Sequence, residues 1–376
     1  MMRTRTIPRN VLRHLMVAEV LVLIPAVQSS LAAQAAKPAA SSDSIGRRRI
    51  QPLPAIGSAP ETGLQFGATV LAVWEPAAVH KARPSSLVAS AVRTARSQTR
   101  ISLEAEHWTP TNARRIAGSL QWQEFPLPWF GIGDRTTKAA QETFTPKGTE
   151  AKLALQQRVA DAWYVTGGAR HLEQRIRFDT NGVLRTAPIV GTAGGAITEW
   201  SAGLMTDTRD NLFAPRAGRW VQLSYARSMR GAWSDYSYGT LRLDARSYRS
   251  IAGEHVVATQ LQLTSVDGAA PFDQLALVGN SDIMRGYTRG RYRDRAMVAV
   301  QTEYRSPIRH RLGGVAFAGA GTVAPSFDAV GHRLFPTYGA GLRFEIDHRQ
   351  RTGVRADYGR GRDGASGLYI GFNNAF

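Results

Sequence analysis

Apolar and polar side chains alternate with a period of two residues along most of the chain after residue 61. Between residues 297 and 307, Val298, Val300 and Tyr304 would lie on one face of an extended strand. Gln301 and Glu303 would lie on the other face. We count about fifteen such segments, each close to the roughly 9–11 residues that a tilted strand needs to cross a bilayer. Period two is typical of strands and not of helices, so the sequence predicts an all-β protein.

The two faces of these segments distinguish between two all-β architectures. In a soluble two-sheet sandwich, the inner faces would have to accept charged side chains or turn them out to water. The last segments combine clean apolar faces with faces that carry Arg343, Glu345 and Asp357. The lumen of a membrane barrel accepts such charge, so we predict a transmembrane antiparallel β-barrel. Bacterial single-chain barrels have even strand numbers, so the count of about fifteen becomes 14 or 16 strands.

The connections between the segments differ in length in a regular way. Short turns, such as residues 252–254 and 347–351, alternate with long polar connections at 126–146, 176–195 and 267–292. Outer-membrane barrels have short periplasmic turns and longer extracellular loops. The last of these loops is rich in arginine, and we expect it to fold inward and plug the barrel.

The first 60 residues differ in composition from the rest. Basic residues precede an apolar run at 15–27, and small residues follow, with Ala33-Gln34-Ala35 as the expected cleavage site. This order is typical of a secretory signal. We predict a signal peptide at 1–35, a periplasmic linker rich in Pro, Ala and Ser at 36–60, and an outer-membrane barrel at 61–376. A spanning helix would need roughly 20 apolar residues, which the apolar run does not reach.

The chain carries a formal net charge of +18, and 42 of its 47 basic residues are arginine. Arginine contacts carboxylates and phosphates bidentately, so the excess of arginine could serve to bind nucleic acid, to bind lipopolysaccharide phosphates or to form internal ion pairs. A genome that prefers arginine codons is the fourth explanation. Arg289, Arg293 and Arg295 cluster with Tyr292, as a nucleic-acid surface requires. Asp294 and the adjoining strand instead favour a loop at a barrel mouth, and we expect no nucleic-acid partner.

The sequence offers no recognisable set of catalytic or metal-binding residues. Its eight histidines are scattered, and it contains neither a His-Glu-x-x-His motif nor a cysteine. Residues Gly279 to Ile283 begin like a nucleophile elbow but lack the final glycine. We therefore predict that the protein is not an enzyme and uses no metal and no cofactor.

Four motifs follow one another in the second half of the chain. They are Asp207-Thr208-Arg209-Asp210-Asn211 with Pro215 and Gly218; Met284-Arg285-Gly286-Tyr287; Gln301 to Pro307; and a C-terminal strand with Leu368, Ile370, Phe372 and Phe376 on one face. Singly each motif is weak, because Asp, Asn, Pro and Gly are ordinary turn residues. Together, in this order, they resemble the bacterial surface antigen family of outer-membrane barrels, to which BamA and TamA belong.

The resemblance implies roles for these residues and favours 16 strands over 14. Arg285 would enter the lumen and pair with Glu303, and the C-terminal strand would be recognised by the cell's barrel assembly machinery. The chain departs from the family twice. Gly319 stands where relatives often carry an aspartate partner for the arginine, and the segment before Thr62 is too short for the periplasmic POTRA domains of BamA and TamA.

The resemblance also implies a function in inserting or translocating proteins or lipids at the bacterial outer membrane. The expected partners are outer-membrane lipids and lipopolysaccharide, the assembly machinery, and a periplasmic protein that replaces the POTRA domains. The alternative is a passive pore or structural barrel with the same fold and no assembly activity. A soluble, secreted polymer-binding protein is the third hypothesis.

Overall fold

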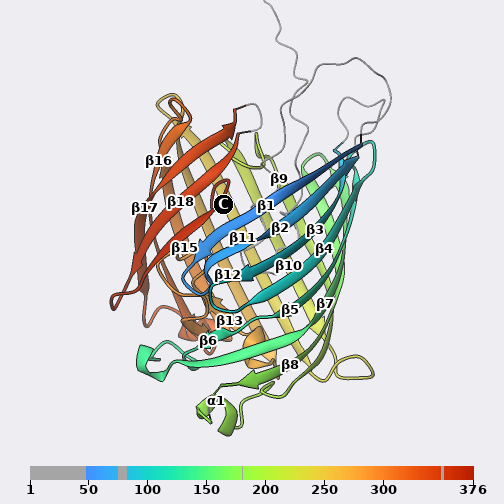
Figure 1. The fold of residues 1–376 in the computed structure, drawn as a ribbon, viewed down its shortest axis with the longest axis vertical. Helices are drawn as coiled ribbons and strands as arrows, with labels where there is room; N and C mark the ends of the chain where they lie inside the picture. The colour runs from blue at the N-terminus through green and yellow to red at the C-terminus, as the bar shows by residue number, and fades with distance from the viewer. Residues whose placement is uncertain (1–47, 75–82, 180, 349–350) are drawn as a thin grey trace, which may run out of the picture.

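A computed structural model describes residues 48–74, 83–179, 181–348 and 351–376. Sixteen long strands form a closed antiparallel barrel in which strands that follow one another along the chain pair with each other, and β1 meets β19 (Figure 1). The prediction of a barrel with an even number of strands, with 16 favoured, is confirmed. Within the described residues, no helix has the length and apolar character needed to cross a membrane.

The elements have the following bounds. The wall consists of β1 (Arg48–Ala59), β2 (Gly63–Trp74), β3 (Ser85–Thr94), β4 (Thr99–Trp108), β5 (Arg114–Glu124), β7 (Glu142–Ala160), β8 (Trp163–Phe178), β9 (Gly194–Asp207), β10 (Gly218–Ser228), β11 (Tyr238–Ile251), β12 (His255–Gly268), β15 (Ala296–Arg305), β16 (Leu312–Ala324), β17 (Phe335–Asp347), β18 (Thr352–Gly361) and β19 (Ser366–Phe372). The connections hold β6 (Leu127–Trp129), β13 (Ala276–Val278), β14 (Tyr292–Asp294), α1 (Val183–Thr186), and 3-10 turns at Lys138–Ala140, Phe272–Gln274 and Phe327–Ala329.

The two faces of the wall are opposite in character. Leu153, Trp200 and Leu342 point outward and are 57%, 59% and 64% exposed. Glu150 and Asp244 point inward and are buried. A water-soluble sandwich would hide the apolar face and expose the charged one, so this distribution suits a barrel surrounded by lipid and excludes the sandwich alternative.

The up-and-down strand order places alternate connections at opposite ends of the barrel. The long connections at 125–141, 181–193 and 269–295 share one end, which is the lower end in Figure 1, where β7, β8 and α1 project beyond the other strands. Two predicted loops are shorter than expected, because β7 already begins at Glu142 and β8 continues to Phe178.

The predicted linker at 36–60 is wrong for its second half, because residues 48–59 form β1. Prolines 52 and 54 obscure the alternation there, yet Ile50 and Ile56 point outward while Leu53 and Ala55 are buried. The barrel therefore begins before residue 61. The signal peptide at 1–35 and the first part of the linker lie outside the described residues.

A charge on the outer face should destabilise the barrel in proportion to its depth in the bilayer. Leu103 lies in the middle of β4 and is 44% exposed, and Val159 lies near the end of β7 and is 60% exposed. We expect Leu103→Arg to cost about 2–4 kcal/mol and Val159→Arg about 0–1 kcal/mol. The measurement is urea unfolding of the chain refolded into lipid vesicles. Equal losses at the two positions would contradict a membrane-embedded outer face.

Candidate functional site

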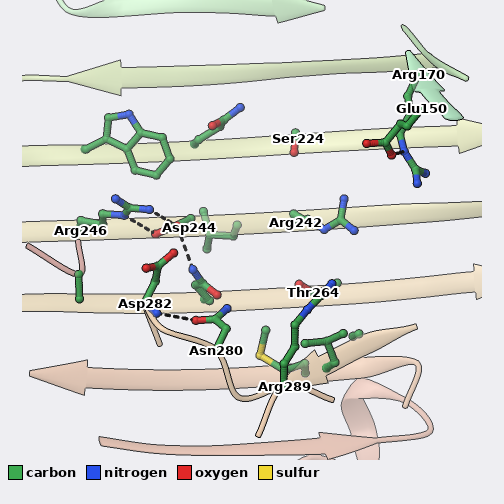
Figure 2. Close-up of a pocket in the computed structure, with 18 of the residues that line it drawn as sticks. Glu150, Arg170, Ser224, Arg242, Asp244, Arg246, Thr264, Asn280, Asp282 and Arg289 are labelled. Atoms are coloured by element: carbon green, nitrogen blue, oxygen red, sulfur yellow. Dashed lines mark hydrogen bonds and ion pairs between the residues drawn. The ribbon is translucent and has the colours of Figure 1, made fainter. Parts of the chain in front are cut away.

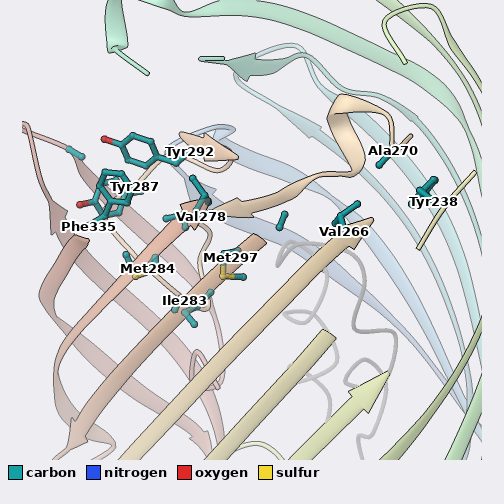
Figure 3. Close-up of a cluster of buried hydrophobic side chains, with 14 of the residues drawn as sticks. Tyr238, Val266, Ala270, Val278, Ile283, Met284, Tyr287, Tyr292, Met297 and Phe335 are labelled. Atoms are coloured by element: carbon teal, nitrogen blue, oxygen red, sulfur yellow. The ribbon is translucent and has the colours of Figure 1, made fainter. Parts of the chain in front are cut away.

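The loop between β12 and β15, residues 269–295, packs inside the barrel. Its apolar side chains form a buried cluster with residues of the wall, and Figure 3 shows Tyr287, Tyr292 and Phe335 gathered together. The Tyr292 ring is stacked on that of Phe335, with 3.7 Å between ring centroids and 12° between ring planes. Met284 and Met297 belong to the same cluster. The expected inward-folding loop is present, and apolar packing helps to hold it in the lumen in addition to its charged contacts.

The Met284-Arg285-Gly286-Tyr287 motif forms a tight turn against β18. Gly286 has a φ of +112°, and a Cβ there would lie 2.7 Å from the carbonyl carbon of Arg360. Only glycine allows both this backbone conformation and this close approach. The Gly286 amide donates to the Tyr369 hydroxyl at 2.9 Å, and the Tyr287 hydroxyl donates to the Pro336 carbonyl at 2.7 Å. The turn is thereby fixed to β19 and β17 as well.

Arg285 is held by two carboxylates in the lumen. Its Nη2 lies 2.6 Å from Glu303 Oε2 on β15, and its Nη1 lies 2.6 Å from Asp357 Oδ2 on β18. All three side chains are fully buried. The guanidinium also lies 3.6 Å from the centre of the Phe317 ring. The predicted partner Glu303 is thus in contact, and Asp357 supplies the second carboxylate that Gly319 does not.

Three further arginines complete this network. Arg305 Nε lies 2.7 Å from Glu303 Oε1, while Arg343 and Arg355 contact Asp357. The sequence places these arginines on the polar faces of their strands but gives no reason to assign them to the site. Removing one partner of a buried ion pair leaves an uncompensated charge, so each member depends on the others.

The Asp207–Gly218 motif forms the turn between β9 and β10. Asp207 Oδ1 accepts from Arg209 Nε at 2.9 Å, and Asn211 Oδ1 accepts from the Phe213 and Ala214 amides at 2.8 Å. Asp210 Oδ1 accepts from two backbone amides, and its Oδ2 accepts from Arg351 at 2.7 Å. Burial alone would raise the pKa of Asp210, but these hydrogen bonds lower it below its ordinary value.

This turn touches the lumen network. The Pro215 carbonyl accepts from Arg305 Nη1 at 3.4 Å, and Arg305 Nη2 donates to Phe376 O at 2.6 Å. Arg305 therefore joins the turn motif, the C-terminal residue and Glu303, which are far apart in sequence.

The expectation that four C-terminal side chains share one face is wrong for Phe376, whereas Phe372 still pairs with Val354 and continues the alternation of Leu368 and Ile370. Leu368 and Ile370 point outward, Phe372 at the end of the strand is 7% exposed, and Phe376 is 4% exposed. Strand β19 ends at Phe372, and Asn373 has a φ of +55°, so the alternation stops and the chain turns inward. Phe376 packs with Tyr248 and Ala258.

The rest of the lumen contains a cavity of about 420 Å³ lined by charged side chains (Figure 2). Ion pairs lie along its wall: Arg170 Nε lies 2.5 Å from Glu150 Oε1, and Arg246 Nη2 lies 3.0 Å from Asp244 Oδ2. Within the described residues, no group of three or more His, Cys, Asp or Glu side chains is placed to hold a metal ion.

The comparisons with known proteins decide the family. A model described as the Omp85 superfamily domain matches residues 85–359, which is more than half of the chain. The chain belongs to the Omp85 superfamily. The resemblance to the BamA and TamA type of barrel is thereby confirmed. A comparison with curated protein sequences found no significant match.

Two solved structures share the fold. BamA from Haemophilus ducreyi lacking POTRA domains 1–3 matches with a TM-score of 0.58 and 16% identity, covering 88% of this chain and 70% of that one. CdiB from Acinetobacter baumannii matches with a TM-score of 0.55 and 12% identity, covering 88% of this chain and 66% of that one. At these identities the likeness establishes the architecture alone.

The lumen network predicts unequal effects of its members on stability. Glu303→Ala removes the carboxylate that holds both Arg285 and Arg305, so we expect a loss of about 3–5 kcal/mol. Arg285→Ala leaves both carboxylates with other arginines and should cost less, about 1–3 kcal/mol. The free energy of unfolding in vesicles, followed by heat-modifiable gel migration, measures both losses.

The matched control is Arg135→Ala, which removes an exposed loop cation and should change stability by about 0.5 kcal/mol or less. Losses in the two lumen variants no larger than in this control would show that the network does not stabilise the barrel.

The turn motif predicts a position-specific need for glycine. Gly218 has a φ of +100°, and a Cβ there would lie 2.2 Å from the Thr208 carbonyl oxygen. Gly253 has a φ of +80° with no atom within 4 Å of the same position. We expect Gly253→Ala to cost about 1–2 kcal/mol from backbone strain, and Gly218→Ala about 3 kcal/mol or more because a steric clash is added. Comparable unfolding free energies for the two variants would show that the Thr208 carbonyl does not exclude a side chain at position 218.

Proposed function

We propose that this Omp85 barrel inserts or translocates proteins or lipids at the bacterial outer membrane through a seam between β1 and β19. The pairing of these two strands carries the proposal. Within the described residues they pair at Ser58 and Ile370 alone. By contrast, β1 pairs with β2 along its whole length, and β18 pairs with β19 along all of β19. The barrel is therefore closed most weakly where its first and last strands meet.

The composition of the two strands supports the same seam. Pro52 and Pro54 lie within β1 and have no amide hydrogen to donate, which is typical of edge strands. The facing β19 has only seven residues and includes Gly367 and Gly371, which offer no side chain for packing. Unpaired backbone groups in a bilayer cost several kcal/mol each, so such an edge favours pairing with an added strand.

The loop inside the lumen favours a route through the wall over a route along the barrel axis. Residues 269–295 occupy the lumen, and the buried ions fasten their turn to β15 and β18. Moving this loop would break the network, whereas opening the seam would break one residue pair. The alternative function is a passive pore, which would conduct along the axis without opening the seam.

The remaining assignments belong to the same proposal. The signal peptide, the short turns and the apolar outer face favour an outer-membrane location, with lipids and lipopolysaccharide around the wall. Outward-pointing Leu368 and Ile370 would present the C-terminal strand to the cell's barrel assembly machinery. A periplasmic protein that captures substrate would act together with the barrel. The protein would perform no covalent chemistry and use no cofactor.

The experiment is a reversible crosslink across the seam. The chain contains no cysteine, so Ser58→Cys with Ile370→Cys introduces one pair at the point where β1 meets β19. We expect oxidation to slow the insertion of an unfolded outer-membrane barrel protein into vesicles about tenfold, and reductant to restore it. The readout is heat-modifiable migration of the inserted substrate.

The control pair is Leu223→Cys with Leu243→Cys, which lies inside the continuous ladder between β10 and β11. Oxidation of this pair should leave the insertion rate unchanged. Insertion that is equally fast with the seam locked would overturn the proposed route. Steady large currents in planar bilayers, unaffected by the seam crosslink, would instead identify a passive pore.

A further inference from the structure

The lumen cavity has an excess of positive charge. Ten arginines and six carboxylates line it, with no lysine and no histidine among the lining residues. Figure 2 shows Arg242 on the wall and Arg289 on the inward loop among the residues that surround this space. Five of the six carboxylates are already engaged with arginines: Glu106 with Arg115, Glu150 with Arg170, Asp207 with Arg209, Asp244 with Arg246, and Asp282 with Arg355. The excess positive charge therefore resides on the lining arginines that form none of these ion pairs.

Three of these side chains form one group. They are Arg100 on β4 and, from the inward loop, Arg289 and Arg293. Within the part of the chain that the structure describes, no carboxylate oxygen lies within 4.0 Å of a guanidinium nitrogen of any of the three, so none of them forms an ion pair. Arg289 repels both Arg100 and Arg293 electrostatically, so like charges from β4 and from the inward loop lie near one another.

The donors of this group are incompletely used. Arg100 is 5% exposed, and its Nε and Nη1 are buried without an acceptor, while its Nη2 donates to Gln123 at 3.2 Å. Arg293 is 4% exposed, and its Nη1 donates to the Phe272 carbonyl at 3.3 Å while its Nε has no acceptor. The Nε of Arg289 also has none. Buried guanidinium donors without acceptors are costly, and a bound anion would satisfy them.

The nearby carboxylates compensate only in part. Asp273 Oδ2 accepts from Gln174 at 2.6 Å and from Gln274 at 2.9 Å, so one of its oxygens is committed to amides. Burial raises the pKa of Glu61, in the turn between β1 and β2, which disfavours its charged form. Burial lowers the pKa of Arg289 to about 10, which still leaves this side chain protonated at neutral pH.

The local backbone leaves room for the group. A Cβ at Gly290 would lie 2.6 Å from Arg293 Nη2, so the glycine between Arg289 and Arg291 allows that guanidinium to fold over the loop. The Arg100 guanidinium lies 4.5 Å from the centre of the Phe125 ring, which holds it in place. Arg293 also lies 5.9 Å from the centre of the Phe272 ring, so among the described residues Arg100 and Arg293 are positioned by packing and not by an ion pair.

We propose that Arg100, Arg289 and Arg293 form a binding site for a phosphate-type oxyanion in the lumen. Guanidinium groups match the oxygens of phosphate bidentately, and three of them around one cavity suit a group with two or more negative charges. Arg242 lacks a carboxylate partner among the described residues and adds positive potential from β11. A free phosphate and the phosphorylated headgroup of a lipid share this chemistry.

The test measures binding to the full chain refolded in an uncharged detergent. Inorganic pyrophosphate is titrated in one arm, and phosphatidic acid in mixed micelles is titrated in the other, by calorimetry. We expect Arg289→Gln and Arg293→Gln each to weaken binding about tenfold, since each removes charge-assisted hydrogen bonds. Arg135→Gln, which removes an exposed loop cation, should change binding less than about twofold.

A second measurement separates binding from folding. Because the wild-type arginines are unpaired, Arg289→Gln without ligand should unfold at the same urea concentration as wild type or a higher one. Pyrophosphate should raise the wild-type midpoint and leave that of the variant unchanged. Binding in the pyrophosphate arm identifies a free oxyanion, and binding in the lipid arm alone identifies a headgroup. No binding in either arm, or equal binding by all variants, would overturn the proposal.

Discussion

The structure depends on holding Arg285 inside the barrel between two carboxylates. A guanidinium removed from water is costly unless its charge is matched, and Glu303 and Asp357 each contact it at 2.6 Å. Because the carboxylates come from β15 and β18, the single Arg285 side chain fastens the loop to two separate parts of the wall. Arg305 extends the network to the turn motif and to Phe376. The lumen, the loop and one rim are thereby a single electrostatic unit.

Rigidity is consequently uneven around the barrel. The strands from β15 to β18 are joined by continuous ladders and by buried ions, whereas β1 and β19 meet at one residue pair. A barrel that accepts a new strand laterally needs a firm template beside a weak edge, because an opening must not unfold the wall. The proposed function assigns these two properties to different parts of the same cylinder.

The lumen is divided in a similar way. Around Arg285 each arginine contacts a carboxylate of the chain itself, although the Nε atoms of Arg285 and Arg355 have no acceptor. Among the described residues, Arg100, Arg289 and Arg293 have no carboxylate at ion-pair distance, and their Nε donors have no acceptor. Aromatic rings flank Arg100 and Arg293. The first region resembles a structural fastening, and the second resembles a binding site whose acceptor comes from outside the chain. The overall excess of arginine therefore has two different physical uses.

The sequence by itself determined the barrel, because strands with apolar and charged faces can bury the charged face only around a wet lumen. It also indicated the Arg285 contact with Glu303, since the motif and the polar strand face pointed to it, and it placed Asp357 on a suitable face. Only the tertiary structure decided the rest. The prolines in β1 hide its alternation, and pairing with β2 reveals the strand. The turn at Asn373 takes the final phenylalanine out of the strand pattern. Which arginines lack a carboxylate depends on which strands face one another across the closed lumen, and no local pattern contains that information.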